Sequence, residues 1–165
     1  MNPFGSFFQF GDVQWRILAY VVSAMVLGAL IGWERETLNK PAGLRTHTLV
    51  SGAAALLVAL GDLVVTHFGQ DLGAPLVQTD PIRLIEAVIT GVSFLGAGTI
   101  IRAQGDGHVE GLTTAASLLF SATIGIAVAL SQAVLAAGVT VLALVALRGL
   151  GALRAWMSNR NQERT

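Results

Sequence analysis

The most restrictive feature of this sequence is a stretch without a single charged side chain, which covers residues 111–147. A helix that crosses the hydrocarbon core of a bilayer, which is about 30 Å thick, needs roughly 20 apolar residues. The uncharged stretch is too long for one such helix and fits two. The polar pair Ser131-Gln132 predicts a tight turn between them. The stretch therefore predicts two membrane-spanning helices, at 112–130 and 133–150.

The composition supports a membrane protein and excludes several other classes. Charged residues make up 12% of the chain, whereas soluble domains carry about 25% and need that charge on their surface. Ten basic and ten acidic residues balance one another, which argues against nucleic-acid binding because that activity requires clustered Lys and Arg. The absence of cysteine excludes disulfides, cysteine-ligated zinc and thiol chemistry. We therefore predict an all-α, polytopic helical protein embedded in a lipid bilayer.

Three further apolar segments bring the number of predicted spans to five. The first has tryptophans near both ends, which suits the two membrane interfaces. The third begins at Asp80-Pro81, which is typical of an N-cap followed by proline at the first helical position. These three spans are predicted at 15–33, 46–66 and 81–101.

The Lys and Arg residues predict the orientation, because cytoplasmic loops carry an excess of positive charge. With five spans, the N-terminus lies outside and the C-terminus inside, and only Arg16 and Arg83 fall on the outer side. The segment before the first span has no positively charged region, so we expect no cleavable signal peptide. The predicted architecture is a transmembrane domain, 1–150, and a short basic cytoplasmic tail, 151–165. The eight basic residues on the inner side are Arg35, Lys40, Arg45, Arg102, Arg148, Arg154, Arg160 and Arg164.

Glycines are predicted to mediate helix packing, because small residues let helices approach closely in lipid. Gly28 and Gly32 form a GxxxG pair in the first span. The pair is explained either by packing within the chain or by the seam of a homodimer.

The third span contains a denser group of glycines: Gly91, Gly96 and Gly98. Either a neighbouring backbone packs tightly there, or the helix is broken and lines a polar path. Because Gly96 and Gly98 lie about 200° apart on a helix, one packing partner cannot explain both. The small residues of 111–117, which open the next helix, are the expected neighbours.

Charged and polar residues surround the connection between the first two spans. Glu34 lies at a helix C-terminus, where the helix dipole disfavours a carboxylate, so it needs a cation, and Arg35 and Arg45 are nearest in the sequence. The result is either a solvated ion pair or a functional charge network. Arg45, Thr46 and His47 open the second span, where free N–H groups and side-chain donors would hold an anion or a partner's carboxylate. We predict that Glu34, Arg45 and His47 cluster at the cytoplasmic end.

Asp62, Asp80 and Glu86 are weaker candidates for a metal site near the outer surface. Carboxylates that leave room for bound water suit Mg²⁺. Alternatively, these groups face interfacial water or pair with Arg83, which lies three residues before Glu86. We expect no cofactor, and Mg²⁺ is the one ion that these carboxylates suggest.

The histidines and the absence of catalytic motifs predict that the chain is not an enzyme. His47 and His108 fall on the inner side and His67 on the outer side, so we interpret all three as isolated loop or interface histidines rather than as a metal site. The sequence contains no HExxH, GxSxG or Walker motif, and no serine–histidine pair lies at one depth.

Three motifs, AGLRTHTLV, FLGAGTI and GLTTAAS, occur in this order within 28–130, together with GALIGWERE and DPIR. In combination they resemble the MgtC/SapB family of bacterial inner-membrane proteins. The resemblance implies a multi-pass protein of the inner, cytoplasmic membrane that is linked to magnesium limitation, stress adaptation and, in some pathogens, virulence. It also implies action through membrane protein partners such as the ATP synthase or sensor kinases.

Two functions follow from these patterns: a regulator that acts through other membrane proteins, and a transporter of Mg²⁺ or another cation. We favour the regulator, because a transport path would place ionisable groups at mid-membrane and here every charge lies near a helix end. MgtC itself carries a soluble domain after its last helix, so we expect this chain to be a short form without that domain. The candidate functional residues are Glu34, Arg35, Arg45, Thr46, His47, Asp80, Arg83, Gly96, Gly98, Thr113 and Thr114.

Overall fold

The computed structural model describes residues 3–71, 81–102 and 111–162, with the surroundings of side chains given for 12–66, 82–100 and 111–149. These residues form five α-helices joined by short connections, which confirms the predicted all-α fold. The helices are α1 (Pro3–Thr37), α2 (Leu44–Asp71), α3 (Pro81–Arg102), α4 (Leu112–Ala129) and α5 (Ala133–Gln162).

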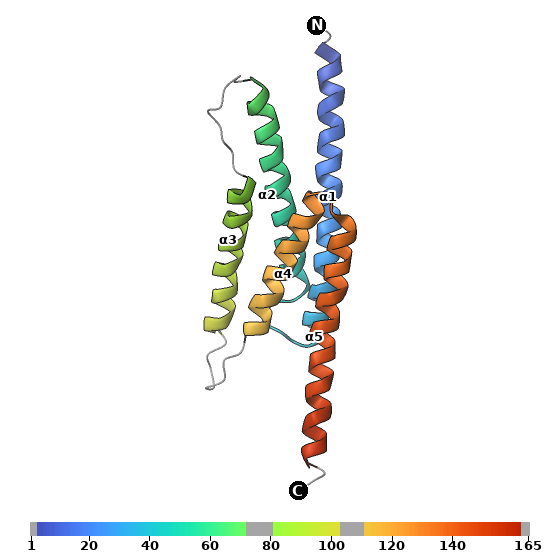
Figure 1. The fold of residues 1–165 in the computed structure, drawn as a ribbon, viewed down its shortest axis with the longest axis vertical. Helices are drawn as coiled ribbons and strands as arrows, with labels where there is room; N and C mark the ends of the chain where they lie inside the picture. The colour runs from blue at the N-terminus through green and yellow to red at the C-terminus, as the bar shows by residue number, and fades with distance from the viewer. Residues whose placement is uncertain (1–2, 72–80, 103–110, 163–165) are drawn as a thin grey trace.

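The helices run up and down along one long bundle (Figure 1). We call the end where α1 finishes and α2 begins the C-terminal end of the bundle, and the opposite end the N-terminal end. α4 contacts each of the other four helices, whereas α3 contacts only α2 and α4 and lies at one edge. α5 contacts only α1 and α4. The bundle is therefore organised around α4.

Four helices are long and apolar enough to cross a membrane, and they match the predicted spans closely. The apolar part of α5 with described surroundings, Ala133–Gly149, is shorter than these four. The boundary predicted at residue 150 lies inside α5, which continues without interruption to Gln162. The four longer spans are Asp12–Thr37, Leu44–Thr66, Ile82–Ile100 and Leu112–Ala129.

The connection between α1 and α2 is closed by two caps. Asn39 adopts a left-handed conformation (φ 51°), and the Lys40 and Asn39 N–H groups donate to the carbonyls of Arg35 and Glu36, both at 3.0 Å. This is the Schellman arrangement that ends many helices. The Leu44 N–H donates to Glu36 Oε2 at 2.7 Å, so a carboxylate of the chain itself caps the start of α2.

The turn predicted at Ser131-Gln132 is confirmed. Ser131 has φ 61°, and the N–H groups of Ser131 and Gln132 donate to the carbonyls of Val128 and Ala127, both at 2.9 Å. The pattern is again a Schellman motif. A hydrogen bond of 2.7 Å between the hydroxyls of Tyr20 and Ser131 ties the turn to α1.

The GxxxG pair of α1 packs within the chain, against α2. A Cβ added to Gly28 would lie 2.6 Å from the carbonyl oxygen of His47, and one added to Gly32 would lie 2.7 Å from Leu44 Cα. A Cβ on Gly125 of α4 would likewise collide with the Ser51 carbonyl of α2. Glycines of α1 and α4 thus bring both helices against the backbone of α2.

Neither of the two alternatives considered for the glycines of α3 describes all three of them. α3 is a continuous helix, so the broken-helix alternative is wrong. A Cβ on Gly96 would lie 3.1 Å from Ala115 Cβ, which confirms the predicted neighbour, but Gly91 and Gly98 have no atom within 4 Å of theirs. The packing role predicted for Gly91 is therefore wrong within the chain, and so is the idea that two helices press on Gly96 and Gly98. Gly91 and Gly98 lie instead on the exposed face of α3.

We expect Gly96→Leu to destabilise the protein and Gly98→Leu to leave it unchanged. Leucine at position 96 would push α3 away from Ala115, at a cost of about 1–3 kcal/mol for overpacking. Leucine at 98 meets open space. Thermal unfolding of the two purified variants in detergent checks this, and equal melting temperatures would contradict the packing described for Gly96.

Candidate functional site

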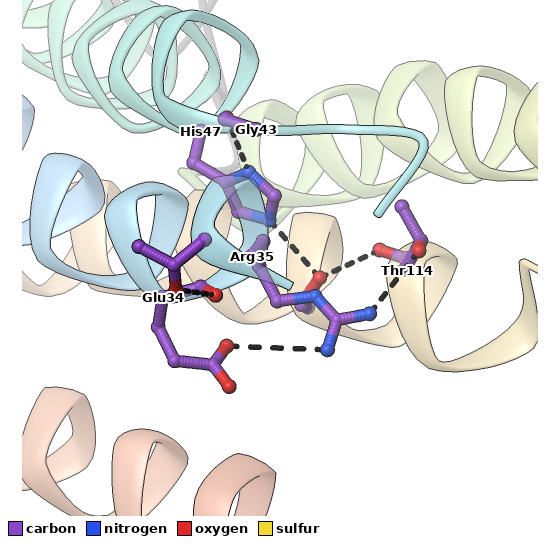
Figure 2. A network of polar contacts seen from close by, with 7 residues as sticks. Glu34, Arg35, Gly43, His47 and Thr114 are labelled. Atoms are coloured by element: carbon purple, nitrogen blue, oxygen red, sulfur yellow. Dashed lines mark hydrogen bonds and ion pairs between the residues drawn. The ribbon is translucent and has the colours of Figure 1, made fainter. Parts of the chain in front are cut away.

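The strongest candidate for a functional site lies at the C-terminal end of the bundle, where α1, α2 and α4 meet. Four polar side chains from these helices are buried there: Glu34 (1% exposed), Arg35 (3%), His47 (0%) and Thr114 (1%). Figure 2 shows them pointing toward one another between the helices. We call these four residues, together with Ser117, the polar cluster.

Glu34 and Arg35 form an ion pair inside the cluster. Arg35 Nη1 lies 3.9 Å from Glu34 Oε2, and Arg35 Nη2 donates a hydrogen bond of 3.3 Å to Thr114 Oγ1 on α4. The guanidinium therefore lies between a carboxylate and a hydroxyl (Figure 2). The predicted pairing of Glu34 with a cation is confirmed, with Arg35 as the cation. The pair is buried, so the alternative of a solvated ion pair is wrong.

The ion pair is incompletely satisfied by the described residues. Neither carboxylate oxygen of Glu34 has a hydrogen-bond partner among them, and Arg35 Nε also has none. Burying a charge without hydrogen bonds costs several kcal/mol. Natural proteins retain such groups rarely, and each one needs an explanation, such as a functional role or an ordered water.

His47 joins α2 to α4. Its Nδ1 lies 2.8 Å from the Gly43 carbonyl oxygen, and its Nε2 lies 3.0 Å from Ser117 Oγ. Ser117 in turn donates to the Thr114 carbonyl at 2.8 Å. The interpretation of His47 as an isolated loop or interface histidine is wrong, because its imidazole is fully buried and bonded on both sides. His67 and His108 lie outside the residues whose surroundings are described.

The close packing of α1 on α2 positions His47. A Cβ on Gly32 would lie 2.7 Å from Leu44 Cα and 3.0 Å from His47 Cβ, so a larger residue there would press on the start of α2 and on His47. Ser51, one turn further along α2, is also fully buried, and its hydroxyl has no hydrogen-bond partner among the described residues.

Sequence reasoning missed Ser117 and Ser51. The signal for Ser117 was its spacing, because Thr114, Ser117 and Ser121 follow one another at i, i+3 and i+7 in an otherwise apolar helix. That spacing places three hydroxyls on one helix face. The structure buries all three, and Thr114 bonds to Arg35 of α1 and Ser117 to His47 of α2. Ser51 carries no comparable signal.

Three other candidates of this region lie outside the cluster. Arg45 and Thr113 are exposed, and Thr46 is half-buried. The prediction that Arg45 joins Glu34 and His47 is therefore wrong, because its side chain is exposed whereas theirs are buried. The anion site predicted at the start of α2 is occupied by the chain's own Glu36.

The predicted outer carboxylates do not form a metal site in the described residues. Asp62 and Glu86 are exposed, and so is Arg83. The part of the chain with described side chains contains no group of three His, Cys, Asp or Glu residues placed to hold a metal ion. Arg83 and Glu86 form no ion pair with each other. Asp80 lies outside the described residues.

Ser117→Ala is expected to destabilise the protein more than Ser121→Ala. The first variant leaves the buried Nε2 of His47 without its partner, at a cost of about 1–2 kcal/mol. The hydroxyl of Ser121 bonds only to the Ser117 carbonyl within α4 itself, at 3.1 Å, so its loss breaks no link between helices. Chemical unfolding of both variants in mixed micelles measures the difference, and an equal effect would argue against a structural role of the His47–Ser117 bond.

The comparison with known proteins identifies the family. Residues 21–156 match the MgtC family. Protein MgtC of Brucella abortus (strain 2308) is 38% identical over 68% of this chain and 43% of its own length. Protein SapB of Bacillus subtilis (strain 168) is 36% identical over 67% of this chain and 46% of its own length. The "Putative magnesium transporter YhiD" of Escherichia coli (strain K12) is 39% identical over 68% of this chain and 49% of its own length.

The chain spans about half the length of these curated relatives. No solved structure matches it significantly. The match to the family covers α2, α3 and α4 completely and includes every residue of the polar cluster. The helical bundle with its four possible membrane spans agrees with this match, and so do the motifs found in the sequence. The chain belongs to the MgtC family.

Proposed function

We propose that this protein is a non-enzymatic membrane protein of the bacterial inner membrane that supports adaptation to low Mg²⁺ by acting on other membrane proteins. The observation that carries the proposal is the polar cluster, in which Glu34 and Arg35 are buried at one end of the bundle with hydrogen-bonding capacity left over. A buried ion pair adds little to stability by itself, so its presence supports a role besides stability. The names of the MgtC relatives and the magnesium label of YhiD support the link to magnesium.

The distribution of charge supports a regulator over a transporter. Along α1 no charged residue occurs between Arg16 and Glu34, and α4 contains none. A path for ions through the membrane requires polar or ionisable groups at mid-depth. The buried polar side chains near mid-depth are small hydroxyls such as Ser51 and Thr140, which bind a bare divalent cation poorly.

A crosslinking experiment tests the regulator. A photoreactive amino acid at Leu38, which is 50% exposed beside the polar cluster, should capture a membrane protein in magnesium-starved cells. By family resemblance, the ATP synthase and sensor kinases are the expected captures. The same probe at Leu142 on α5, which is 67% exposed, is the matched control. Identical captures at both positions, or none in starved cells, would overturn the proposal.

A cation transporter is the second candidate, favoured by the printed name of YhiD. Purified protein in liposomes with a fluorescent Mg²⁺ indicator separates the two functions. The regulator predicts no flux above protein-free liposomes. Flux that disappears in Asp62→Asn or Glu86→Gln would establish the transporter in its place.

We expect the N-terminus outside and the C-terminus inside the cell. This orientation places the exposed Lys40 and Arg45 and the end of α5 in the cytoplasm, as the excess of positive charge requires. A green fluorescent protein fused to the C-terminus should fluoresce, and alkaline phosphatase at the same position should be inactive. The reverse pattern would show the opposite orientation.

A further inference from the structure

One side of α1 is exposed and apolar between two tryptophans. Trp15 and Trp33 are 71% and 63% exposed. They are 18 residues apart, which is about five helical turns and about 27 Å along the axis, so both lie on the same side of the helix. We call this side the α1 stripe. The exposed side chains between the two tryptophans on this stripe are Leu18, Val22, Val26 and Leu30.

α2 carries a second stripe of the same kind, which begins at Arg45. The side chain of Arg45 is exposed, and the next charged residue along the helix is Asp62. At 100° per residue, the exposed positions 45, 49, 53, 56 and 60 fall within about 80° of one another. After Arg45, the α2 stripe consists of Leu49, Ala53, Leu56 and Leu60.

The packing of α1 on α2 places one end of each stripe at the same height. A Cβ added to Gly32 would lie 2.7 Å from Leu44 Cα. Trp33 and Arg45 each follow one of these two residues in the sequence. The α1 stripe therefore finishes, and the α2 stripe begins, in one plane at the C-terminal end of the bundle.

The other ends of the apolar stretches also lie at one height. A Cβ added to Gly52 would lie 2.6 Å from Met25 Cγ, so these two positions are level. α1 and α2 run in opposite directions (Figure 1), and Trp15 is as far from Met25 along α1 as the exposed Asp62 is from Gly52 along α2. Trp15 and Asp62 therefore define a second plane, about 27 Å from the first.

We infer that the two stripes are covered by lipid, with Trp33 and Arg45 in the headgroup layer at the C-terminal end and Trp15 and Asp62 in the opposite headgroup layer. The spacing of the two planes is close to the thickness of the hydrocarbon core, about 30 Å. Tryptophan suits a headgroup layer, because its ring is apolar and its N–H is polar. No Asp, Glu, Lys or Arg lies on either stripe between the two planes.

The chemistry of Arg45 assigns it to the phosphates of the lipid headgroups. An arginine at the end of an apolar stripe lays its alkyl stem along the apolar surface and holds its guanidinium at the headgroups. The guanidinium of Arg45 forms no ion pair within the described residues, and phosphate is a group that guanidinium binds with two hydrogen bonds. This side chain therefore binds lipid phosphate, whereas Glu36 caps the backbone of the same helix start.

The two planes also determine the depth of the polar cluster. Glu34 and Arg35 directly follow Trp33, and His47 comes two residues after Arg45. The cluster is therefore level with the headgroups and not with the middle of the bilayer. This depth does not depend on the proposed regulatory function, because it holds whether or not another protein binds the cluster.

Fluorescence quenching by brominated lipids tests which part of the bilayer covers each stripe. The chain has three tryptophans, so replacing two of them by phenylalanine leaves Trp15 or Trp33 alone. Each should be quenched more by bromine near the headgroup than by bromine near the bilayer centre. Val26→Trp and Leu56→Trp, in a background without other tryptophans, are the matched controls from the middle of the stripes and should show the reverse order.

Two results would overturn the assignment of the stripes to lipid. Stronger quenching of Trp15 or Trp33 by the deep bromines would mean that the two planes are not at the headgroups. Absence of quenching in Val26→Trp or Leu56→Trp by either lipid would mean that protein covers that stripe.

Thermal unfolding in two media tests the role of Arg45. In phospholipid nanodiscs, Arg45→Gln should lower the melting temperature by about 2–4 °C, and Arg45→Lys, which keeps the charge, should lose less. In maltoside micelles, which contain no phosphate, Arg45→Gln and the wild type should melt together.

Three outcomes would refute the binding of lipid phosphate by Arg45. Equal melting temperatures in nanodiscs would show that the lipid makes no contact with its charge. The same loss in both media would show that Arg45 acts within the chain. Stabilisation of the wild type, but not of Arg45→Gln, by inorganic phosphate added to the micelles would identify free phosphate as the ligand instead.

Discussion

Gly28→Leu should abolish accumulation of the protein in the membrane. A Cβ at this position would lie 2.6 Å from the His47 carbonyl oxygen and 2.7 Å from Ser51 Cβ, in a stretch of α2 against which Gly125 of α4 also packs closely, at Ser51. Overpacking in a well-packed core costs about 1–3 kcal/mol when side chains can move, and here the obstacle is backbone. Since native proteins are stable by only about 5–15 kcal/mol, separation of α1 from α2 removes a large part of that margin.

Gly138→Leu is the control for this variant. It makes the same replacement in another helix of the bundle, but no atom lies within 4 Å of a Cβ added at position 138. Immunoblotting of membranes and unfolding of the purified proteins should show normal levels for the Gly138 variant and little or none for the Gly28 variant. Normal levels of both would mean that α1 and α2 do not pack as closely as the structure shows.

The pattern of charge and hydrophobicity was enough to predict the fold. An uncharged stretch that is too long for one helix allows few arrangements in a membrane, so the pair α4–α5 and its turn at Ser131 followed from the sequence. The helix ends were also predictable where a residue type determines them, as at Pro81. The length of α5 was not, because the basic residues after Leu150 suggested a tail separate from the span, whereas the helix continues to Gln162.

The contents of the candidate site were only partly predictable. Glu34 needed a cation, and its neighbour Arg35 supplies one. Which way a side chain points depends on the angle between helices, which the sequence does not give, so Arg45 was placed in the cluster although its side chain is exposed. His47 was interpreted as an interface residue because a histidine near a helix start is usually solvated. In the structure, Gly28 and Gly32 bring α1 and α2 close enough to bury it.

The glycines of α3 show a second limit. A glycine in a membrane helix marks a close contact, but the sequence alone does not say whether the contact lies within the chain. Gly96 faces Ala115, whereas Gly91 and Gly98 face outward. Neither tight packing nor a broken helix, the two alternatives left open from the sequence, describes all three glycines, because only the orientation of α3 separates the inward Gly96 from the outward Gly91 and Gly98.

Replacing Glu34 or Arg35 singly should destabilise the protein far more than replacing both. Glu34→Leu leaves the guanidinium of Arg35, which is 3% exposed, without a counter-charge. Arg35→Met leaves the carboxylate of Glu34, which is 1% exposed, without a cation. Removal of one member of a buried ion pair costs about 3–5 kcal/mol, whereas replacement of both by apolar residues of similar size is often neutral. Chemical unfolding of the two single variants and the double variant measures these differences.

The double variant also separates stability from function. If Glu34 and Arg35 served only to hold α1 against α4, Glu34→Leu/Arg35→Met would accumulate normally and support growth at low Mg²⁺ as well as the wild type does. We expect normal accumulation without growth, because the proposed function depends on the buried charges of Glu34 and Arg35, whose hydrogen-bonding capacity is only partly used by the described residues. Full growth of the double variant would show that the polar cluster is structural, and the site of regulation would have to lie elsewhere on the bundle.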